Sequence, residues 1–208
     1  ILEKENLPVG WIPIKINDVC KLIGGGTPSR ANPKYFGGST IWLTPTDILK
    51  NKIIEISNSE LKITELGFKE SSAQKIPTGS VVMTSRAGIG KVGIAGTELT
   101  TNQGITSFVC SKAIINYFLA YFLVLNKSYL EDVGSGTTFN EISKSKLKEI
   151  ETFLPPLNEQ KRIVSKINAM FSEIDSIMQL LKQTILQLEQ HRLSLIKSAF
   201  EGKMTEKW

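Results

Sequence analysis

The sequence predicts an α+β protein: a compact head of mixed strands and helices, followed by one long α-helix that pairs as a coiled coil. Two observations lead to this prediction. From residue 157 to residue 200, apolar side chains recur at alternating spacings of three and four, and no Pro or Gly interrupts them. Before Pro155, short apolar runs alternate with Gly-, Pro- and Ser-rich stretches. We therefore expect two domains, 1–155 and 156–208.

The first half of the head reads as strands separated by loops. After an exposed lead-in at 1–10, residues 11–16 alternate between apolar and polar and predict a strand, and Asp18 caps a short helical turn that extends to residue 23. Glycines and Pro28 make 24–30 a loop, which continues through 34–38. The apolar residues 41–44 predict a strand that ends at a proline.

The second half of the head continues the same mixture. The patterns predict a short helix at 64–68, strands at 81–85, 92–95 and 106–110, a buried helix at 114–125, a small-residue loop at 134–140 and a short amphipathic stretch at 142–150. Two prolines at 155 and 156 close the head, because neither can lie inside a helix.

The long helix carries a heptad seam. Asn158 is its expected N-cap and Gly202 its expected end. A helix of about 43 residues is about 65 Å long, so a head of this size cannot cover it and the seam needs another long helix, in this chain or in a partner. Only Thr184 and His191 interrupt the seam, which consists of Ile163, Ile167, Met170, Ile174, Ile177, Leu181, Leu188 and Leu195.

Composition limits the function without fixing it. The formal net charge is +5, with 17 Lys+Arg against 14 Asp+Glu in residues 1–155 and 8 against 6 in 156–208, so the positive charge is spread out and permits nucleic-acid binding without requiring it. Cys20 and Cys110 are isolated in the sequence, and we expect them to be buried and reduced, in the cytoplasm. No apolar run is long enough for a membrane span, and no segment resembles a signal peptide.

Catalytic motifs are not supported. Residues 88–93 fit the pattern G-x-G-x-x-G after a strand, but strand and turn residues follow where a dinucleotide site needs a helix. The single histidine, His191, lies on the heptad seam, where it sets register rather than performs chemistry. No cluster has metal-ligand spacing and no serine lies in a nucleophile elbow. We therefore expect a protein that is not an enzyme and binds no metal.

Four loops of the head are instead rich in hydrogen-bond donors. Arg reads guanine, Asn and Gln read adenine, and small hydroxyl groups hold phosphates. These loops predict a surface that reads double-stranded DNA, with the candidate contacts Thr27, Ser29, Arg30, Ser85, Arg86, Asn102, Gln103, Ser135, Thr137, Thr138 and Asn140. Trp11 and Trp42 are expected to pack in the core rather than stack on bases.

Short motifs follow one another along nearly the whole chain. They are Leu7-Pro8-x-Gly10-Trp11, Gly25-Gly26-Thr27-Pro28, Ile41-Trp42-Leu43-Thr44-Pro45, Ser85-Arg86-Ala87-Gly88-Ile89-Gly90, Thr101-Asn102-Gln103-Gly104, Gly134-Ser135-Gly136-Thr137-Thr138-Phe139, Leu154-Pro155-Pro156-Leu157-x-Glu159-Gln160-x-x-Ile163-Val164 and Ala199-Phe200-Glu201-Gly202-Lys203. In this order, and ending in a long heptad helix, they make the chain similar to the specificity (S) subunits of Type I restriction–modification systems.

The resemblance implies a target recognition domain followed by a conserved spacer helix. It implies a subunit that binds bipartite DNA and recruits modification (methyltransferase) and restriction subunits. Those partners would bind S-adenosylmethionine, ATP and Mg and perform methylation, ATP hydrolysis and cleavage, while this chain binds no cofactor. The family usually carries two recognition domains and two spacer helices, whereas this sequence has one of each. It is therefore either a half-length subunit that forms a homodimer through the long helix, or a fragment of a longer chain.

Two alternatives remain open. The chain could be a coiled-coil adaptor whose head binds protein, in which case partner binding would not depend strongly on salt as DNA binding does. It could also be the specificity module of a fused restriction–methylation enzyme, which methyltransferase motifs ahead of Ile1 would reveal. The first residue is Ile rather than Met, so residues ahead of it can be missing.

Overall fold

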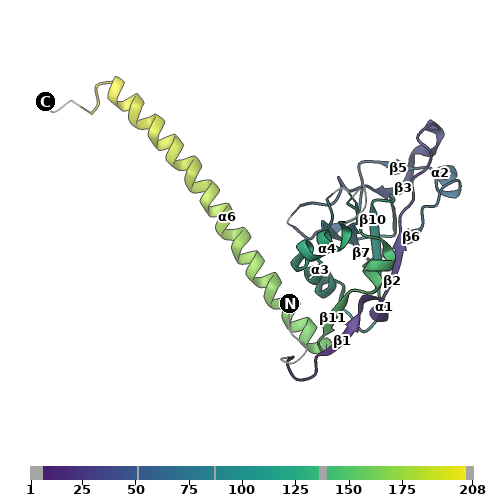
Figure 1. Cartoon of the computed structure of the whole chain (residues 1–208). Helices are drawn as coiled ribbons and strands as arrows, with labels where there is room; N and C mark the ends of the chain where they lie inside the picture. The colour runs from purple at the N-terminus through teal and green to yellow at the C-terminus, as the bar shows by residue number, and fades with distance from the viewer. Residues whose placement is uncertain (1–6, 51, 87, 136–139, 205–208) are drawn as a thin grey trace. The chain divides into compact units, whose positions relative to one another are not determined.

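The structure of the protein is a computed structural model that describes residues 7–50, 52–86, 88–135 and 140–204. Its contacts divide the chain into two compact units, Ile1–Arg162 and Ile163–Trp208. The first unit, called the head below, contains the strands and short helices, and the second contains most of one long helix (Figure 1). The predicted α+β class with a long C-terminal helix is confirmed.

Among the described residues, the strands of the head form sheets of five, four and two strands. The five-stranded sheet has the order β2 (Cys20–Gly24), β10 (Ile105–Cys110), β7 (Val81–Thr84), β8 (Val92–Ala95) and β4 (Glu55–Ile56). The four-stranded sheet has the order β5 (Lys62–Ile63), β3 (Phe36–Leu43), β9 (Leu99–Thr101) and β6 (Lys75–Ile76), and β1 (Ile12–Lys15) pairs with β11 (Glu151–Leu154). Strand β4 is parallel to β8 and β3 is parallel to β9, whereas the other pairs are antiparallel.

The five-stranded sheet lies in the middle of the core. Helices complete the head: α1 (Ile16–Val19), the 3₁₀ helix η2 (Pro33–Tyr35), α2 (Glu65–Lys69), α3 (Asn116–Leu125), α4 (Lys127–Gly134) and α5 (Lys144–Lys148). Successive residues of a strand point to opposite faces. Accordingly, Val81 and Met83 of β7 pack with Leu119 of α3, whereas Val82 packs with Leu43 and Leu99 of the four-stranded sheet. The sheet is therefore covered on both faces.

Most elements predicted for the head are present. The strands expected at 11–16, 81–85, 92–95 and 106–110 and the helix expected at 64–68 appear with small shifts of their ends. Helix α2 begins where its sequence signal lies, because the Thr64 hydroxyl accepts a hydrogen bond from the Gly67 amide at 3.0 Å. The helix expected at 114–125 is present as α3, but only one face is fully buried, at Leu119, Ala120 and Leu123.

Three predictions about local structure are wrong. The helical turn expected at 18–23 ends at Val19, because Cys20–Gly24 pairs with β10 as strand β2. Residues 36–38, expected in a loop, begin strand β3. Asn158 is not the N-cap of the long helix, since α6 (Leu157–Phe200) begins one residue earlier and the Pro156 carbonyl accepts hydrogen bonds from the amides of Glu159 and Gln160.

Helix α6 has 44 residues, as the heptad pattern predicts. The helix ends at Phe200, and Gly202, two residues further on, has a φ of +74°, the left-handed conformation typical of a glycine that follows a helix. The compact head includes the first turns of α6 up to Arg162, beyond the boundary expected at residue 155. Gln160 explains this, because its side chain is fully buried in the head.

Candidate nucleic-acid interface

Sheet topology brings three of the predicted loops to one edge of the head. Strand β10 is antiparallel to both β2 and β7, with Thr106 opposite Gly24 and Ile105 opposite Thr84. The beginning of β10 therefore lies beside the ends of β2 and β7. The loops that start at Gly25 and Ser85 consequently meet residues 101–104, which lead into β10.

The loop after β2 packs directly on the backbone of residues 101–102. The Gly26 amide donates to the Thr101 carbonyl at 2.9 Å, and the buried Trp42 indole Nε1 donates to the Gly26 carbonyl at 2.9 Å. A Cβ atom on Gly25 would collide with the Asn102 carbonyl. This close approach requires glycine, and it brings the Thr27 hydroxyl within hydrogen-bond reach of Gln103 Oε1.

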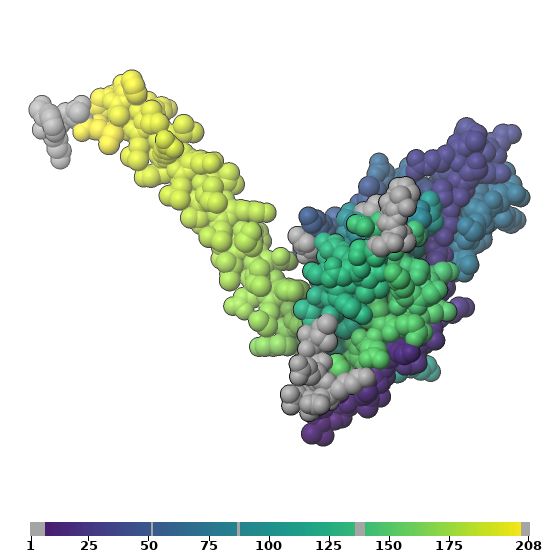
Figure 2. Space-filling view, viewed as in Figure 1, coloured from purple at the N-terminus to yellow at the C-terminus, as the bar shows by residue number. Residues whose placement is uncertain are grey.

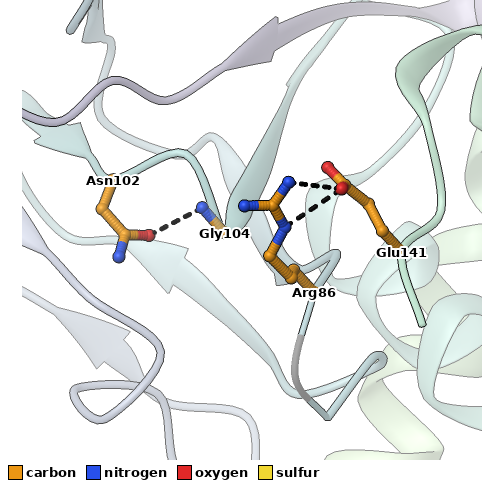
Figure 3. Close-up of polar contacts among 4 residues, drawn as sticks. All are labelled: Arg86, Asn102, Gly104 and Glu141. Carbon is orange, nitrogen blue, oxygen red and sulfur yellow. Dashed lines mark hydrogen bonds and ion pairs between the residues drawn. The ribbon is translucent and has the colours of Figure 1, made fainter. Parts of the chain in front are cut away.

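Asn102 is oriented by its own loop. Its side-chain Oδ1 accepts a hydrogen bond from the Gly104 amide at 3.0 Å (Figure 3). Its backbone amide donates to the Leu43 carbonyl at 2.8 Å. The side chain is half-buried, whereas that of neighbouring Gln103 is exposed. Both predicted amides therefore lie at the edge, and Asn102 is held in place by a hydrogen bond.

Arg86 reaches the same edge and is held by an acidic residue distant in sequence. Its Nε donates to Glu141 Oε2 at 3.0 Å and its Nη2 donates to the same oxygen (Figure 3). The Arg86 side chain is 45% exposed and that of Glu141 35% exposed. Backbone bonds join the segments as well, since the Ser85 amide donates to the Gly104 carbonyl at 2.8 Å and the Ile142 amide donates to the Ser85 carbonyl at 3.0 Å.

The remaining predicted residues differ in their surroundings. The Ser85 side chain is buried, at 3% exposed, so only its backbone takes part in the edge. Ser29, Arg30 and Asn140 are exposed. The Ser135 hydroxyl donates to the Asp132 carbonyl at 2.6 Å, a local contact at the end of α4. Thr137 and Thr138 lie outside the described residues.

Two lysines that the sequence motifs do not mark also lie at this edge. Lys144 Nζ lies 3.1 Å from the position that a Cβ on Gly24 would occupy, next to the loop after β2. Lys91 Nζ donates to the Pro45 carbonyl at 3.0 Å, and the ring of Pro45 lies against Gly104. The signal for Lys144 is present in the sequence, because lysines occupy alternate positions from 144 to 148. We call Thr27, Arg86, Asn102, Gln103 and Lys144 the reading edge.

The reading edge offers the chemistry of nucleic-acid recognition. A guanidinium and two amides match the donor and acceptor patterns of bases in the major groove, and a lysine and a hydroxyl suit phosphates. Within the described ranges, no group of three or more His, Cys, Asp or Glu residues could hold a metal ion. No helix in the described part of the chain is long and apolar enough to cross a membrane.

Helix α6, drawn in green to yellow in the space-filling view of Figure 2, exposes large apolar side chains along its length. The seam residues Met170, Ile174, Ile177, Leu181, Leu188 and Leu195 are each 45–63% exposed. A second row, which the sequence prediction did not include, lies beside the seam at heptad spacing and consists of Phe171, Met178 and Ile185, each 50–56% exposed. The exposed stripe is therefore wider than the seam of a two-stranded coiled coil.

Solved structures share this architecture. A chain of the structure described as the basis of "complex assembly and conformational transition of the type I R-M system" gives a TM-score of 0.76 at 22% identity, over 94% of this chain and 47% of that one. The HsdS subunit from Thermoanaerobacter tengcongensis gives 0.71 at 20% identity, over 95% of this chain and 46% of that one. At these identities the likeness concerns the fold.

Sequence relatives identify the family. The type I restriction enzyme MjaIX specificity subunit of Methanocaldococcus jannaschii is 37% identical over 197 residues, which are 93% of this chain and 44% of that protein. The chain thus spans about half the length of this relative. The family described as "Type I restriction modification DNA specificity domain" matches residues 8–190. Head and long helix together therefore belong to the family of Type I restriction modification DNA specificity domains.

Proposed function

We propose that this chain gives sequence specificity to a Type I restriction–modification complex by reading one half of a bipartite DNA site with its reading edge. The observation that carries the proposal is the convergence of loops from distant parts of the sequence on one edge of the five-stranded sheet. Each loop contributes a side chain suited to a base or a phosphate, and direct hydrogen bonds tie the loops to one another.

The side chains divide into base readers and phosphate binders. Arg86 contacts guanine with its guanidinium, and Asn102 and Gln103 contact adenine with their amides. Lys144 binds a phosphate and positions the duplex without reading sequence. Ser29, Arg30, Ser135, Thr137, Thr138 and Asn140 stay candidates for further contacts, and Ser85 contributes its backbone only.

Helix α6 is the proposed docking element for other chains. One apolar row, the seam, pairs with a second long helix, and the adjacent row containing Phe171 supplies surface for further subunits. The modification and restriction subunits would dock on this unit and supply methylation, ATP hydrolysis and DNA cleavage. S-adenosylmethionine, ATP and Mg would then bind to those partners, and this chain would be non-catalytic.

The experiment is a selection of duplexes from a random library by the full chain, alone and together with modification subunits. Binding of the selected duplex and of a scrambled duplex is then compared for the wild type, Arg86→Ala, Lys144→Ala and Lys112→Ala. Lys112 is exposed just after the far end of β10, so Lys112→Ala is the matched control for Lys144→Ala.

Each variant has a distinct expected result. Arg86→Ala costs about 1–3 kcal/mol of binding free energy for the selected duplex and relaxes selection at one base pair. Lys144→Ala weakens binding to both duplexes. It also reduces the steepness with which the logarithm of the binding constant falls with the logarithm of the salt concentration by about one. Lys112→Ala leaves both unchanged. Specific binding that survives Arg86→Ala combined with Gln103→Ala would show that the reading surface lies elsewhere.

The exposed apolar stripe of α6 favours a second candidate, a coiled-coil adaptor that does not bind DNA. Its head would bind a protein partner, and this association would change little with salt because no phosphates are neutralised. Failure to select any duplex, together with salt-insensitive capture of a modification subunit, would support the adaptor.

A further inference from the structure

Cys20 and Cys110 are neighbours in the folded head although 90 positions separate them in the sequence. They face each other directly in the register of β2 and β10, and their sulfur atoms are 4.0 Å apart. The sequence predicted two isolated, buried thiols. Burial is correct for Cys20, at 5% exposed, but Cys110 is only half-buried and the two thiols form a pair.

The backbone around this pair has the geometry that a cross-strand disulfide needs. The Ser111 amide donates to the Val19 carbonyl at 2.8 Å, and the Gly25 amide donates to the Ile105 carbonyl at 3.2 Å. Hydrogen-bonded and non-hydrogen-bonded pairs alternate along antiparallel strands, so Cys20 and Cys110 form a non-hydrogen-bonded pair. In such pairs the Cα atoms are about 4.5 Å apart, within the range of about 4.4–6.8 Å that disulfides use.

The two thiols differ in accessibility and acidity. Cys110 borders a surface hollow of about 400 Å³ that is also lined by Pro77, Gly79, Ser80 and Ile114, whereas Cys20 does not line this hollow and is buried in the core. A hydrogen bond from the Cys20 thiol lowers the pKa of Cys110 by stabilising its thiolate. The same contact, together with burial, raises the pKa of Cys20. Cys110 is therefore the thiol that meets a reagent from solution, and Cys20 is the resolving thiol.

We propose that Cys20 and Cys110 form an oxidation site that reacts with low-molecular-weight disulfides such as oxidised glutathione and closes to an intramolecular disulfide. The Cys110 thiolate attacks one sulfur of the reagent, forms a mixed disulfide and releases one glutathione thiolate. Cys20 then loses its proton, attacks the Cys110 sulfur and releases the second glutathione as a thiol. The protein loses two electrons and two protons, and one oxidised glutathione becomes two reduced ones.

The disulfide would lock the two strands that carry part of the reading edge. Strand β2 runs from Cys20 to the loop at Gly25, and β10 runs from residues 101–104 to Cys110. The bond would form at the end of both strands opposite to these loops. It would close a long loop of chain and raise the urea midpoint of the head by restricting the unfolded state. The proposal does not depend on DNA reading.

The test uses the reduced full chain in glutathione buffers of increasing oxidised fraction. After acid quenching and maleimide labelling, intact mass is measured without reductant. In the wild type we expect both thiols to stop reacting with maleimide at the same oxidised fraction. The intact mass should then lie two hydrogen atoms below that of the unlabelled reduced chain, and one peptide should link Cys20 with Cys110. Cys20→Ala should instead accumulate a stable glutathione adduct on Cys110, whereas Cys110→Ala should leave Cys20 slow to label.

Three results would overturn the proposal. The wild type could stay fully reduced in buffers in which most of the free glutathione is oxidised. It could stop at the glutathione adduct on Cys110, or it could form disulfides only between chains. The wild-type measurement is sufficient by itself, so the proposal stays testable even if an alanine variant fails to fold.

Discussion

Gln160 shows how one buried side chain joins the long helix to the head. It is fully buried, its Oε1 accepts from the Ile115 amide at 2.9 Å, and its Nε2 donates to the carbonyls of Ala113 at 3.0 Å and Pro155 at 2.9 Å. These bonds satisfy backbone groups from two separate segments. Gln160 is therefore the residue that makes the first turns of α6 part of the head.

We predict that Gln160→Ala destabilises the head by about 3 kcal/mol, because it leaves three backbone groups without their partner and opens a cavity. Urea unfolding followed by tryptophan fluorescence measures this, since Trp42 is buried in the head. Gln183→Ala is the control, because Gln183 is exposed on α6. Equal midpoints for both variants would mean that the Gln160 contacts contribute no net stability.

Glu141 holds the guanidinium of Arg86, the side chain that we propose contacts DNA. Its carboxylate holds both Nε and Nη2 of the guanidinium and also places a negative charge at the reading edge. We predict that Glu141→Ala raises affinity for scrambled DNA, because that charge no longer repels phosphates. We also predict that it lowers the ratio of specific to non-specific affinity about tenfold, the equivalent of about 1.4 kcal/mol, because Arg86 loses its orientation.

Binding of the selected and scrambled duplexes by two further variants checks this role of Glu141. Glu141→Gln keeps a hydrogen-bond acceptor and should recover part of the ratio. Glu70→Ala removes an exposed carboxylate that follows α2 and should leave the ratio unchanged. If Glu141→Ala weakens both duplexes equally, Glu141 has only a structural role.

At the scale of elements, the sequence predicts best what local patterns determine. Helix α6 can be predicted from its heptad pattern alone, and the start of α2 can be predicted from Thr64 as its N-cap. Strand β9 and the two-residue strands β4, β5 and β6 were missed because they exist only through pairing with distant strands. The same reason explains the error at Cys20–Gly24, whose apolar residues favour a helical turn until β10 lies beside them.

In the candidate site, too, local features could be predicted from the sequence, whereas features that depend on distant pairing could not. Its loops were located from short motifs, because glycines and polar residues mark loops locally. Their convergence depends on the order of strands in the sheet, and the partner of Arg86 lies 55 positions away. The sequence shows the alternate lysines from 144 to 148, but only the fold shows that Lys144 lies beside the loop after β2, that Glu141 holds Arg86 and that Ser85 is buried.

The seam of α6 permits a direct test of helix pairing. We predict that Ile177→Asn combined with Leu181→Asn abolishes self-association of the chain or its capture of a partner helix, because two polar groups would be buried in the seam. Light scattering and co-purification with modification subunits measure the two effects. Gln179→Asn combined with Gln183→Asn is the matched control, since these positions lie off the seam. Loss of association in the control alone would place the interface on another face of α6.

At the scale of the whole molecule, the mass of the chain in solution decides between two arrangements. A dimer would mean that the seam closes on a second copy, and two heads would then read a palindrome with a fixed gap. A monomer would mean that the partner helix belongs to another chain or to a missing second half, and that this chain reads a single half-site. Light scattering across micromolar concentrations measures this mass directly.

If α6 sets the distance between two reading heads, its length must set the gap between half-sites. Inserting one heptad at the middle of α6 keeps the seam in phase and adds about 10.5 Å to the helix. Because base pairs are about 3.4 Å apart, we predict a selected site whose gap is about three base pairs longer, with unchanged half-site sequences. The same seven residues inserted after Gly202, beyond the helix, should leave the gap unchanged. An unaltered gap in the first variant would show that α6 does not measure the spacing, whereas altered half-sites would mean that the insertion disturbs the heads themselves.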